Sequence, residues 1–161
     1  MIVVSNSSPL VSLAAIGRLD LLRELYGTIT IPQAVHHEVV VQGLGRPGAA
    51  EVQTLDWIVC RDVSDPDVVT ALGGKLDRGE AESIALTVEL QADLLLMDER
   101  LGRVEAARFG LRLIGILGVL IEAKGRGLLR RIEPILDELQ HHAGFRVSEA
   151  LRARVLQAAG E

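Results

Sequence analysis

The sequence is poor in aromatic residues, holds a single cysteine and contains no long apolar run. Its 161 residues include one Trp, one Tyr and two Phe, so the core must consist mainly of Leu, Val, Ile and Ala. Because Cys60 stands alone, no intrachain disulfide can form, which fits a reducing cytoplasm. The apolar stretches fall far short of the roughly 20 residues of a membrane-spanning helix, and no basic leader precedes the first one. We therefore expect a cytoplasmic protein without a membrane segment.

Basic residues are too few to hold the protein to nucleic acid by overall charge. The formal net charge is −5, which argues against that mode of binding. Between Arg100 and Arg131, however, eight basic residues are opposed only by Glu105 and Glu122. This stretch fits either a solvated helix face or a surface that contacts a phosphate backbone beside an acidic site.

Short apolar runs alternate with helical patterns along the chain. The patterns predict strands at 2–5, 28–31, 57–61, 94–97 and 111–114, and helices at 9–25 (broken near Gly17), 32–41, 66–72, 79–90, 100–109, 116–124, 127–141 and 148–158. This alternation predicts an α/β fold, with a parallel sheet of four to five strands flanked by helices. We expect one domain over 1–161, made of an α/β core at 1–124 and a C-terminal helical extension at 125–161.

Two of the strand-like runs stop on the polar residues Asn6 and Asp98. Central parallel strands are covered on both faces and are apolar throughout, and the ligand crevice of such sheets lies beyond the carboxyl ends of the strands. We therefore expect both side chains in that crevice. Asp98 has an alternative role as N-cap of the helix at 100–109. Ser8 is expected to cap the first helix, with Pro9 at its first position.

Carboxylates also fall on helix stripes that are otherwise apolar. Glu38 and Glu80 each share the apolar stripe of their helix, where an unpaired carboxylate is costly. Each also has a plainer explanation, because Glu38 could reach solvent from the edge of its stripe and Glu80 favours the helix dipole from the first turn. Glu82 and Glu89 fall on another face, where we expect them to be solvated.

Three carboxylates and one amide are thus expected at strand ends or on inward stripes: Asn6, Glu38, Glu80 and Asp98. Mg²⁺ and Mn²⁺ prefer such oxygen ligands. Acidic groups gathered without a metal would repel one another, so the set indicates metal binding rather than acid–base work by a lone pair. Ser7 lies at a helix start whose N–H groups could hold a phosphate, although capping alone accounts for it.

Four segments resemble the PIN-domain nucleases in order and spacing over about residues 1–120. They are Val4–Leu10, Pro32–Val35 leading to Glu38, Gly79–Leu86 and Met97–Arg103. Two closing segments, Gly144–Ser148 and Ala159–Glu161, resemble a PIN branch labelled as a domain of unknown function. The resemblance covers nearly the whole chain and implies a parallel sheet with an acidic cleft at the strand ends.

The resemblance also implies a function. Many PIN relatives are Mg²⁺- or Mn²⁺-dependent ribonucleases, including toxins of toxin–antitoxin pairs, and many are dimers. The family's acidic positions correspond to four residues, of which the three carboxylates are implied to be catalytic and all four to bind metal: Asn6, Glu38, Glu80 and Asp98. The implied mechanism is attack of metal-activated water on an RNA phosphodiester.

The expected partners follow from the same resemblance. We expect Ser7, Arg100 and Arg103 to contact the RNA substrate. An antitoxin protein is a further expected partner. A second copy of the chain is the third, in contact through the helices at 127–158.

Asn6 departs from the family, in which the first acidic position is typically Asp. An amide oxygen can ligate Mg²⁺, but it has no charge and cannot take a proton. Metal affinity should therefore be weaker, and a second metal could be lost. Three functions stay open: a ribonuclease with Asn6 assisting, a catalytically silent PIN-like module that binds RNA or protein, and a phosphate-ester binder or hydrolase that uses the serine-rich helix start.

Overall fold

A five-stranded parallel sheet forms the centre of the protein in the computed structural model, which describes residues 1–161. The strand order is β3-β2-β1-β4-β5, and the strands are β1 (Val3–Ser5), β2 (Ile29–Pro32), β3 (Ile58–Arg61), β4 (Leu94–Leu96) and β5 (Leu113–Ile114). Every neighbouring pair is parallel. The predicted α/β fold with a parallel sheet is confirmed.

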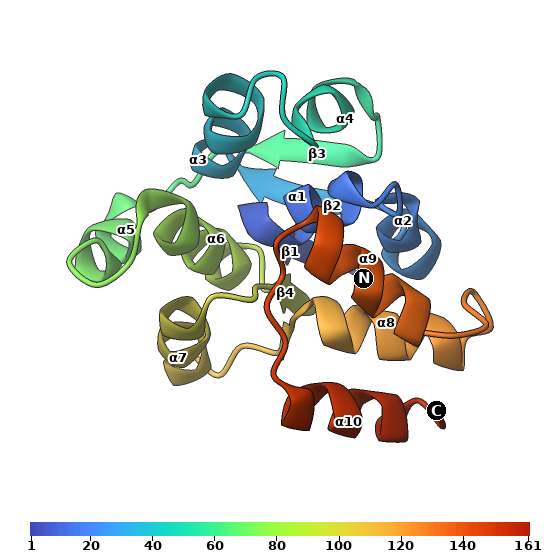
Figure 1. Cartoon of the computed structure of the whole chain (residues 1–161). Helices are drawn as coiled ribbons and strands as arrows, with labels where there is room; N and C mark the ends of the chain where they lie inside the picture. Colours follow the sequence, from blue (N-terminus) through green and yellow to red (C-terminus); the bar gives the residue numbers. More distant parts are fainter.

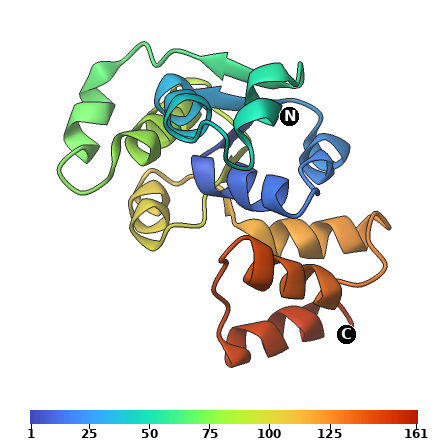
Figure 2. The same cartoon turned by 45° about the horizontal axis from the view of Figure 1, so that its top comes forward.

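Ten α-helices and one wider helical turn flank the sheet. They are α1 (Ser7–Ala15), α2 (Asp20–Tyr26), α3 (Gln33–His36), the π-type turn η1 (His37–Gln42), α4 (Ala49–Thr54), α5 (Pro66–Leu72), α6 (Arg78–Glu89), α7 (Arg100–Arg108), α8 (Ile116–Gly125), α9 (Glu133–His142) and α10 (Glu149–Ala158). Figure 1 shows the arrows of β2 and β3 pointing the same way, toward α3. Figure 2 shows α8, α9 and α10 gathered on one side of the molecule, away from α5. None of these helices has the length and apolar character that crossing a membrane requires.

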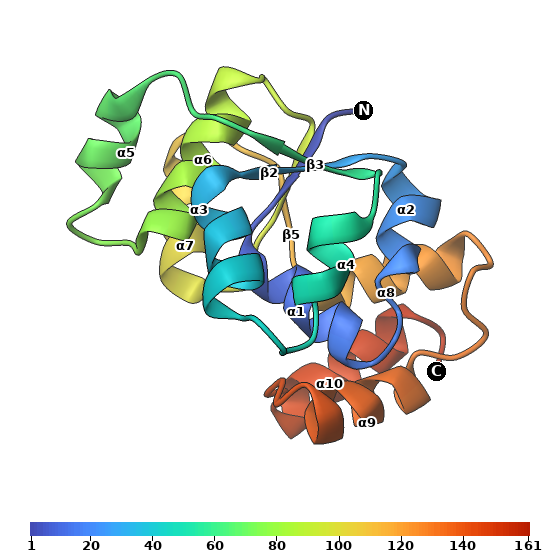
Figure 3. The same cartoon turned by 90° about the horizontal axis from the view of Figure 1, so that it is seen from above.

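Alternating side chains of the central strands build two hydrophobic clusters, one on each face of the sheet. Val3 and Leu96 belong to the larger cluster, which α1, α2, α8 and α9 close, whereas Val4 and Leu95 belong to the smaller one under α6 and α7. Figure 3 shows α6 and α7 to one side of the strands and α2 and α8 to the other. Successive residues of a strand point to opposite faces, so strands covered on both sides must be apolar throughout.

The ladder between β1 and β4 brings the ends of these strands to one level. Val4 pairs with Leu95 and Ser5 with Leu96, and the backbone N–H of Asn6 donates to the Leu96 carbonyl at 3.0 Å. The strand order also reverses here, because β2 and β3 extend from β1 in one direction and β4 and β5 in the other. Ligands of open α/β sheets bind at such a switch point.

The first helix starts earlier than predicted. α1 begins at Ser7 with Asn6 as its N-cap, so the prediction that Ser8 caps the helix and Pro9 opens it is wrong. Pro9 still lies in the first turn, where backbone N–H groups have no partner within the helix. The missing N–H of Pro9 therefore costs the helix no hydrogen bond.

Other boundaries differ for local reasons. The helix predicted at 32–41 is α3 followed by η1, whose wider turn the periodicity did not indicate. α9 begins at Glu133 rather than at 127, because Gly127 turns the chain with a φ of +78° and donates to the Lys124 carbonyl at the end of α8. α4 was not predicted. The division at residue 125 stays a prediction, and residues of α9 and α10 belong to the same cluster as β1.

Candidate acidic site at the strand ends

Asn6 lies almost completely buried where β1 ends, with 3 % of its surface exposed. Its side-chain nitrogen Nδ2 donates to Oε2 of Glu99 at 3.1 Å, while its oxygen Oδ1 is buried without a hydrogen-bond partner. A buried polar atom without a partner costs about 1–3 kcal/mol and is rare. Asn6 therefore presents one unused oxygen to the space beyond the strand.

Gly79 in the first turn of α6 leaves that space open. A Cβ atom at this position would lie 2.9 Å from Oε2 of Glu38 and 3.5 Å from Oδ1 of both Asn6 and Asp77. Three oxygens, from three different parts of the chain, thus converge around a point that any larger residue would occupy. Asp77 was not among the residues predicted for the site.

Glu38 reaches this point from η1. Val35 and Val39 are buried on either side of it, so the wider turn keeps both in the core while Glu38 faces the cleft. The cleft encloses about 750 Å³. Although much of the side chain is exposed, desolvation raises the pKa of the Glu38 carboxyl, and the charges of Asp77 and Glu99 add to the effect.

Asp77 and Glu80 form a reciprocal cap at the start of α6. Oδ1 of Asp77 accepts from the Glu80 N–H at 2.8 Å, and Oε2 of Glu80 accepts from the Asp77 N–H at 3.2 Å. Burial raises the pKa of Glu80, as does the charge of Asp77. Glu80 therefore lies in the first turn of α6, where its charge favours the helix dipole as expected, and also takes part in a cap that the sequence analysis did not predict.

Glu99 acts on several residues of the acidic site, although the sequence analysis did not single it out. It accepts from Nδ2 of Asn6 and from the hydroxyl of Ser8. Its negative charge contributes to raised pKa values of three carboxyls, those of Glu38, Glu80 and Asp98. The signal that could have found it is its position, because it directly follows Asp98 beyond a central strand.

The alternative role predicted for Asp98, as N-cap of α7, is wrong, because the N-cap of that helix is Glu99. Instead Oδ1 of Asp98 accepts from the Ile116 N–H at 3.0 Å, at the start of α8, while Oδ2 is buried without a partner. Burial raises the pKa of Asp98 to about 6; the Ile116 N–H opposes this shift and the charge of Glu99 adds to it.

Comparison with known proteins identifies the family. The family model DUF3368, described as a PIN domain, matches residues 2–161. The chain belongs to the PIN-domain family. A solved structure of a PilT N-terminus domain protein, SSO1118, from the hyperthermophilic archaeon Sulfolobus solfataricus P2 is similar to it, with 20% identity and a TM-score of 0.58. The similarity covers 76% of this chain and 93% of that chain and concerns the fold alone. No curated protein matches the chain.

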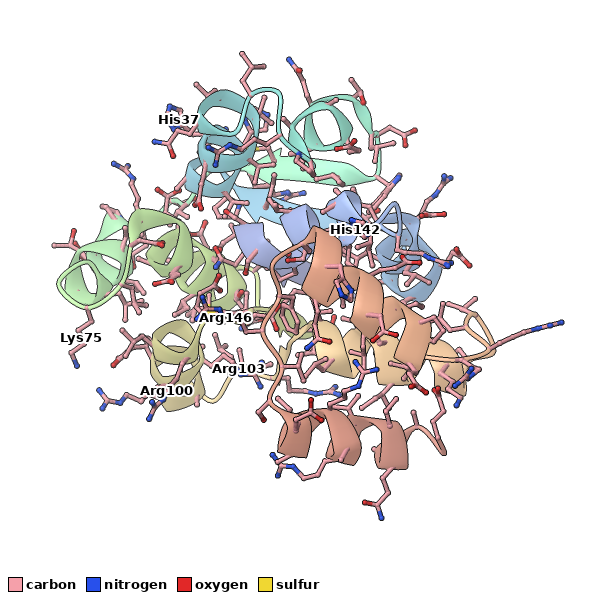
Figure 4. All side chains as sticks on the ribbon, viewed as in Figure 1. His37, Lys75, Arg100, Arg103, His142 and Arg146 are labelled. Carbon is pink, nitrogen blue, oxygen red and sulfur yellow. The ribbon has the colours of Figure 1, made fainter.

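PIN domains are generally nucleases, so the residues expected to bind substrate in this one can be located. Ser7 is buried and lines a small cavity together with Glu38. Arg103 donates to the Met97 carbonyl at 2.8 Å and so holds the segment after β4. Arg100 is exposed, and Figure 4 shows it with Arg103 on α7. Their contacts with substrate stay predictions.

Glu82 of this PIN domain is buried, so the prediction that it is solvated is wrong. Its Oε1 accepts from the Ala34 N–H at 3.2 Å, and its Oε2 accepts from Nε of Arg78 at 2.8 Å. Residues 79–87 of α6 are all buried, because the helix lies between the sheet, α3 and α5. Glu89 at the far end of α6 is exposed, as predicted.

The donor atoms of the site fit a hard cation. As the side chains stand, no three acidic, histidine or cysteine groups are close enough together to hold an ion. Two buried oxygens, Oδ1 of Asn6 and Oδ2 of Asp98, nevertheless lack a partner. Desolvation raises the pKa of the Glu38 and Glu80 carboxyls, and every charged neighbour that adds to these shifts is itself negative. Oxygen donors with surplus negative charge suit Mg²⁺ or Mn²⁺.

Proposed function

We propose that this PIN domain is a metal-dependent endoribonuclease that hydrolyses RNA phosphodiester bonds. The observation that carries the proposal is the convergence of the unpartnered Oδ1 of Asn6 with carboxylate oxygens of Glu38 and Asp77 around Gly79. A cleft with this charge repels a phosphate unless a cation lies between them. The nuclease character of the family and the basic residues of α7 favour RNA as the substrate.

The metal ligands that we propose are Asn6, Glu38, Glu80 and Asp98, joined by Asp77 and Glu99. When bound, Mg²⁺ or Mn²⁺ supplies Lewis-acid activation of the phosphodiester and of water. Glu38, Glu80 and Asp98 act as the catalytic carboxylates. Asn6 contributes its oxygen and, through Nδ2, orients Glu99. Glu99 thereby brings to the site the negative charge that Asn6 lacks.

Each remaining residue has a defined task. The Ile116 N–H fixes Oδ1 of Asp98 and leaves Oδ2 for the site. Arg103 fixes the backbone at Met97, directly before Asp98. Ser7 and Arg100 are proposed to contact the RNA itself, Ser7 beside Glu38 and Arg100 from the surface of α7.

The decisive experiment is cleavage of a panel of single-stranded and structured RNAs in Mn²⁺. We expect wild type to cleave and Asp98→Ala to be slower by about a hundredfold or more, because a metal ligand is lost. Asp56→Ala, which removes an exposed carboxylate outside the site, is the matched control and should cleave like wild type. Absence of cleavage by wild type, or equal cleavage by Asp98→Ala, contradicts the proposal.

Asn6 favours a second candidate, a catalytically silent PIN-like module that binds RNA or a protein. The amide at the first acidic position lowers the charge available to a metal. Asn6→Asp separates the two candidates when nuclease activity is measured in Mn²⁺. A large gain of activity supports the silent module, whereas unchanged activity supports the working nuclease. Mn²⁺ calorimetry on the same variant shows whether the gain follows metal affinity.

The cellular role is a separate proposal. We propose a cytoplasmic toxin of a toxin–antitoxin pair, neutralised by a small antitoxin protein. A small reading frame beside the gene whose product copurifies with this chain and abolishes RNA cleavage would support it. Copurification without inhibition would argue against it.

We also propose a homodimer that forms through α9 and α10, within residues 127–158. Light scattering during size-exclusion chromatography gives the mass of the protein in solution and so distinguishes a dimer from a monomer. Leu101→Glu, an exposed change on α7 (Leu101 is 64 % exposed), should leave a dimer intact if the contact lies on α9 and α10. A monomeric Leu101→Glu would place the contact on α7 instead.

A further inference from the structure

A second cavity adjoins the acidic cleft on the side of α5. It encloses about 750 Å³ and has an aliphatic wall that includes Val69 and Leu76, with Thr70 as a polar neighbour. The two cavities share three lining residues: Gln33, Arg78 and Glu82. They therefore meet at these side chains, and Figure 1 shows α5 beside α6.

Arg78 is the one Arg or Lys that lines either cavity. Its Nε donates to Oε2 of the buried Glu82 at 2.8 Å, while 82% of its side chain stays exposed. Glu82 is itself held by the Ala34 N–H at 3.2 Å. The terminal nitrogens of the guanidinium make no hydrogen bond to the protein. A buried carboxylate thus fixes the inner edge of the guanidinium and leaves the outer edge free.

Stability alone does not account for this arrangement. Nε of Arg78 alone compensates the charge of the buried Glu82, whereas the free edge of the guanidinium matches the two oxygens of a phosphate. Lys75, the basic residue nearest along the chain, pairs instead with Glu105 of α7 at 3.5 Å, and Figure 4 shows it at the outer side of the molecule.

We propose that the cavity between α5 and α6 binds one nucleotide of the substrate and that Arg78 binds the phosphate joining it to the nucleotide at the acidic site. This proposal rests on the proposed ribonuclease function. The volume suits a ligand of nucleotide size, since small-molecule sites enclose about 300–1,000 Å³. No aromatic side chain lines the cavity, so the base would lie against the aliphatic wall and form hydrogen bonds with Gln33 or Thr70. A base can enter only from an unpaired strand.

The test measures binding of a fluorescent single-stranded RNA of about ten nucleotides, a length in the range that single-strand sites cover. The whole chain carrying Asp98→Asn is used to prevent cleavage, with Mg²⁺ present and salt varied. Adding Arg78→Ala should raise Kd about tenfold and lower the dependence of log Kd on log salt by about one phosphate contact. Arg78→Lys keeps the charge but loses the paired N–H groups of the guanidinium. Kd should therefore rise less than for Arg78→Ala, and its salt dependence should stay that of the chain with Arg78.

Two matched controls accompany these variants. Arg23→Ala removes one exposed charge on α2, at a residue that lines neither cavity, and should leave Kd unchanged. Thr70→Glu places a negative charge in the cavity and should raise Kd several-fold by repelling the strand. Thr54→Glu makes the same change on α4, where the threonine hydroxyl bonds to the carbonyl four residues earlier, as Thr70 does. It should have no effect.

The outcomes separate the subsite from the nuclease function. Melting temperatures first confirm that each variant is folded. If Arg78→Ala does not fold, the Kd of Arg78→Lys decides whether Arg78 binds the phosphate. If wild type cleaves RNA while Arg78→Ala and Thr70→Glu keep its Kd and KM within roughly twofold, the subsite is wrong and the nuclease function stands. If wild type neither binds nor cleaves RNA, both are wrong.

Discussion

The contact between Asn6 and Glu99 is the feature of this PIN domain that most changes its chemistry. A carboxylate at position 6 would lie next to Glu99 and repel it, whereas the amide donates a hydrogen bond and holds Glu99 at 3.1 Å. The oxygen of the same amide remains directed toward Glu38 and Asp77. One neutral residue therefore orders an additional charge and keeps an oxygen free for the metal that we propose.

Removing the charge of Glu99 tests this role. Glu99→Gln keeps an oxygen that can accept from Asn6 and Ser8 but loses the negative charge. We expect the affinity for Mn²⁺ to fall about tenfold, which is typical of residues that orient or support metal ligands. Isothermal calorimetry provides the measurement, and Glu24→Gln, an exposed change on α2, is the control. Equal affinities of Glu99→Gln and wild type would exclude Glu99 from the site.

The buried carboxyl of Asp98 makes the metal-free protein sensitive to pH. Its folded pKa of about 6 exceeds the unfolded value of about 3.9, so the folded state binds its proton more tightly. This contribution to stability is complete below about pH 4 and is lost as pH rises through about 6. Its size is on the order of 3 kcal/mol, because one pKa unit corresponds to about 1.4 kcal/mol.

Asp98→Asn should remove that pH dependence. Urea unfolding in the presence of a chelator at pH 4.5 and 7.5 compares the variant with wild type. We expect the variant to gain stability relative to wild type at the higher pH, while Asp56→Asn, at an exposed position, should follow wild type. The same fall in stability for both Asp98→Asn and wild type would show that other groups cause it.

The first turn of α6 combines a structural task with the metal-binding task that we propose for it. Asp77 and Glu80 satisfy each other's backbone N–H groups and so start the helix. Gly79 between them has no side chain, so Oε2 of Glu38 can lie where a Cβ would be only 2.9 Å away. The capping pattern can be recognised in the sequence, whereas the need for glycine appears only once η1 lies beside α6.

Gly79→Ala should separate these two tasks. The backbone of Gly79 does not have a positive φ, and alanine favours a helix over glycine by up to about 1 kcal/mol, so the variant should fold. Its Cβ would lie 2.9 Å from Oε2 of Glu38 and should lower Mn²⁺ affinity about tenfold by displacing that ligand. Gly74→Ala, where a Cβ meets nothing within 4 Å, should bind Mn²⁺ like wild type. Unchanged affinity of Gly79→Ala would place the ion elsewhere.

At the scale of the whole molecule, Glu161 joins the last segment of the chain to two other helices. Its side chain accepts from Nζ of Lys124 on α8 at 2.9 Å and from the Ile132 N–H at the start of α9 at 2.7 Å. Desolvation raises the pKa of Glu161, but the Ile132 N–H and the Lys124 ammonium lower it to about 2. The ionised side chain therefore acts as a cap for α9.

Glu161→Gln should weaken this connection. We expect a loss of about 1 kcal/mol at pH 7, the usual effect of removing a helix cap, measured by urea unfolding. The folded pKa is lower than the unfolded one, so this stabilisation is present above about pH 4.5 and disappears as pH falls toward 2. Glu24→Gln is again the control. If RNA cleavage by Glu161→Gln changes while its stability does not, the cap has a different role.

Local patterns predicted the central strands and most helices because those patterns depend on near neighbours. β1 and β4 are covered on both faces, so nearly all their residues are apolar and each strand appears in the sequence as a short continuous apolar run. The burial of Glu82 could not be predicted in this way, because α6 is enclosed by α3 and α5 and has no solvated face there. The partner of Asp98 likewise depends on where α8 begins.

The sequence by itself determined the α/β class, the polar residues that end β1 and β4, and the family. These follow from side-chain periodicity and from segments that the family shares. Only the tertiary structure decided that Asn6 meets Glu99 across 93 positions, that Gly79 leaves room for Glu38, and that Arg78 stands between two cavities. The physical reason is that strand register and helix packing set these distances, and neither can be read from a short stretch of chain.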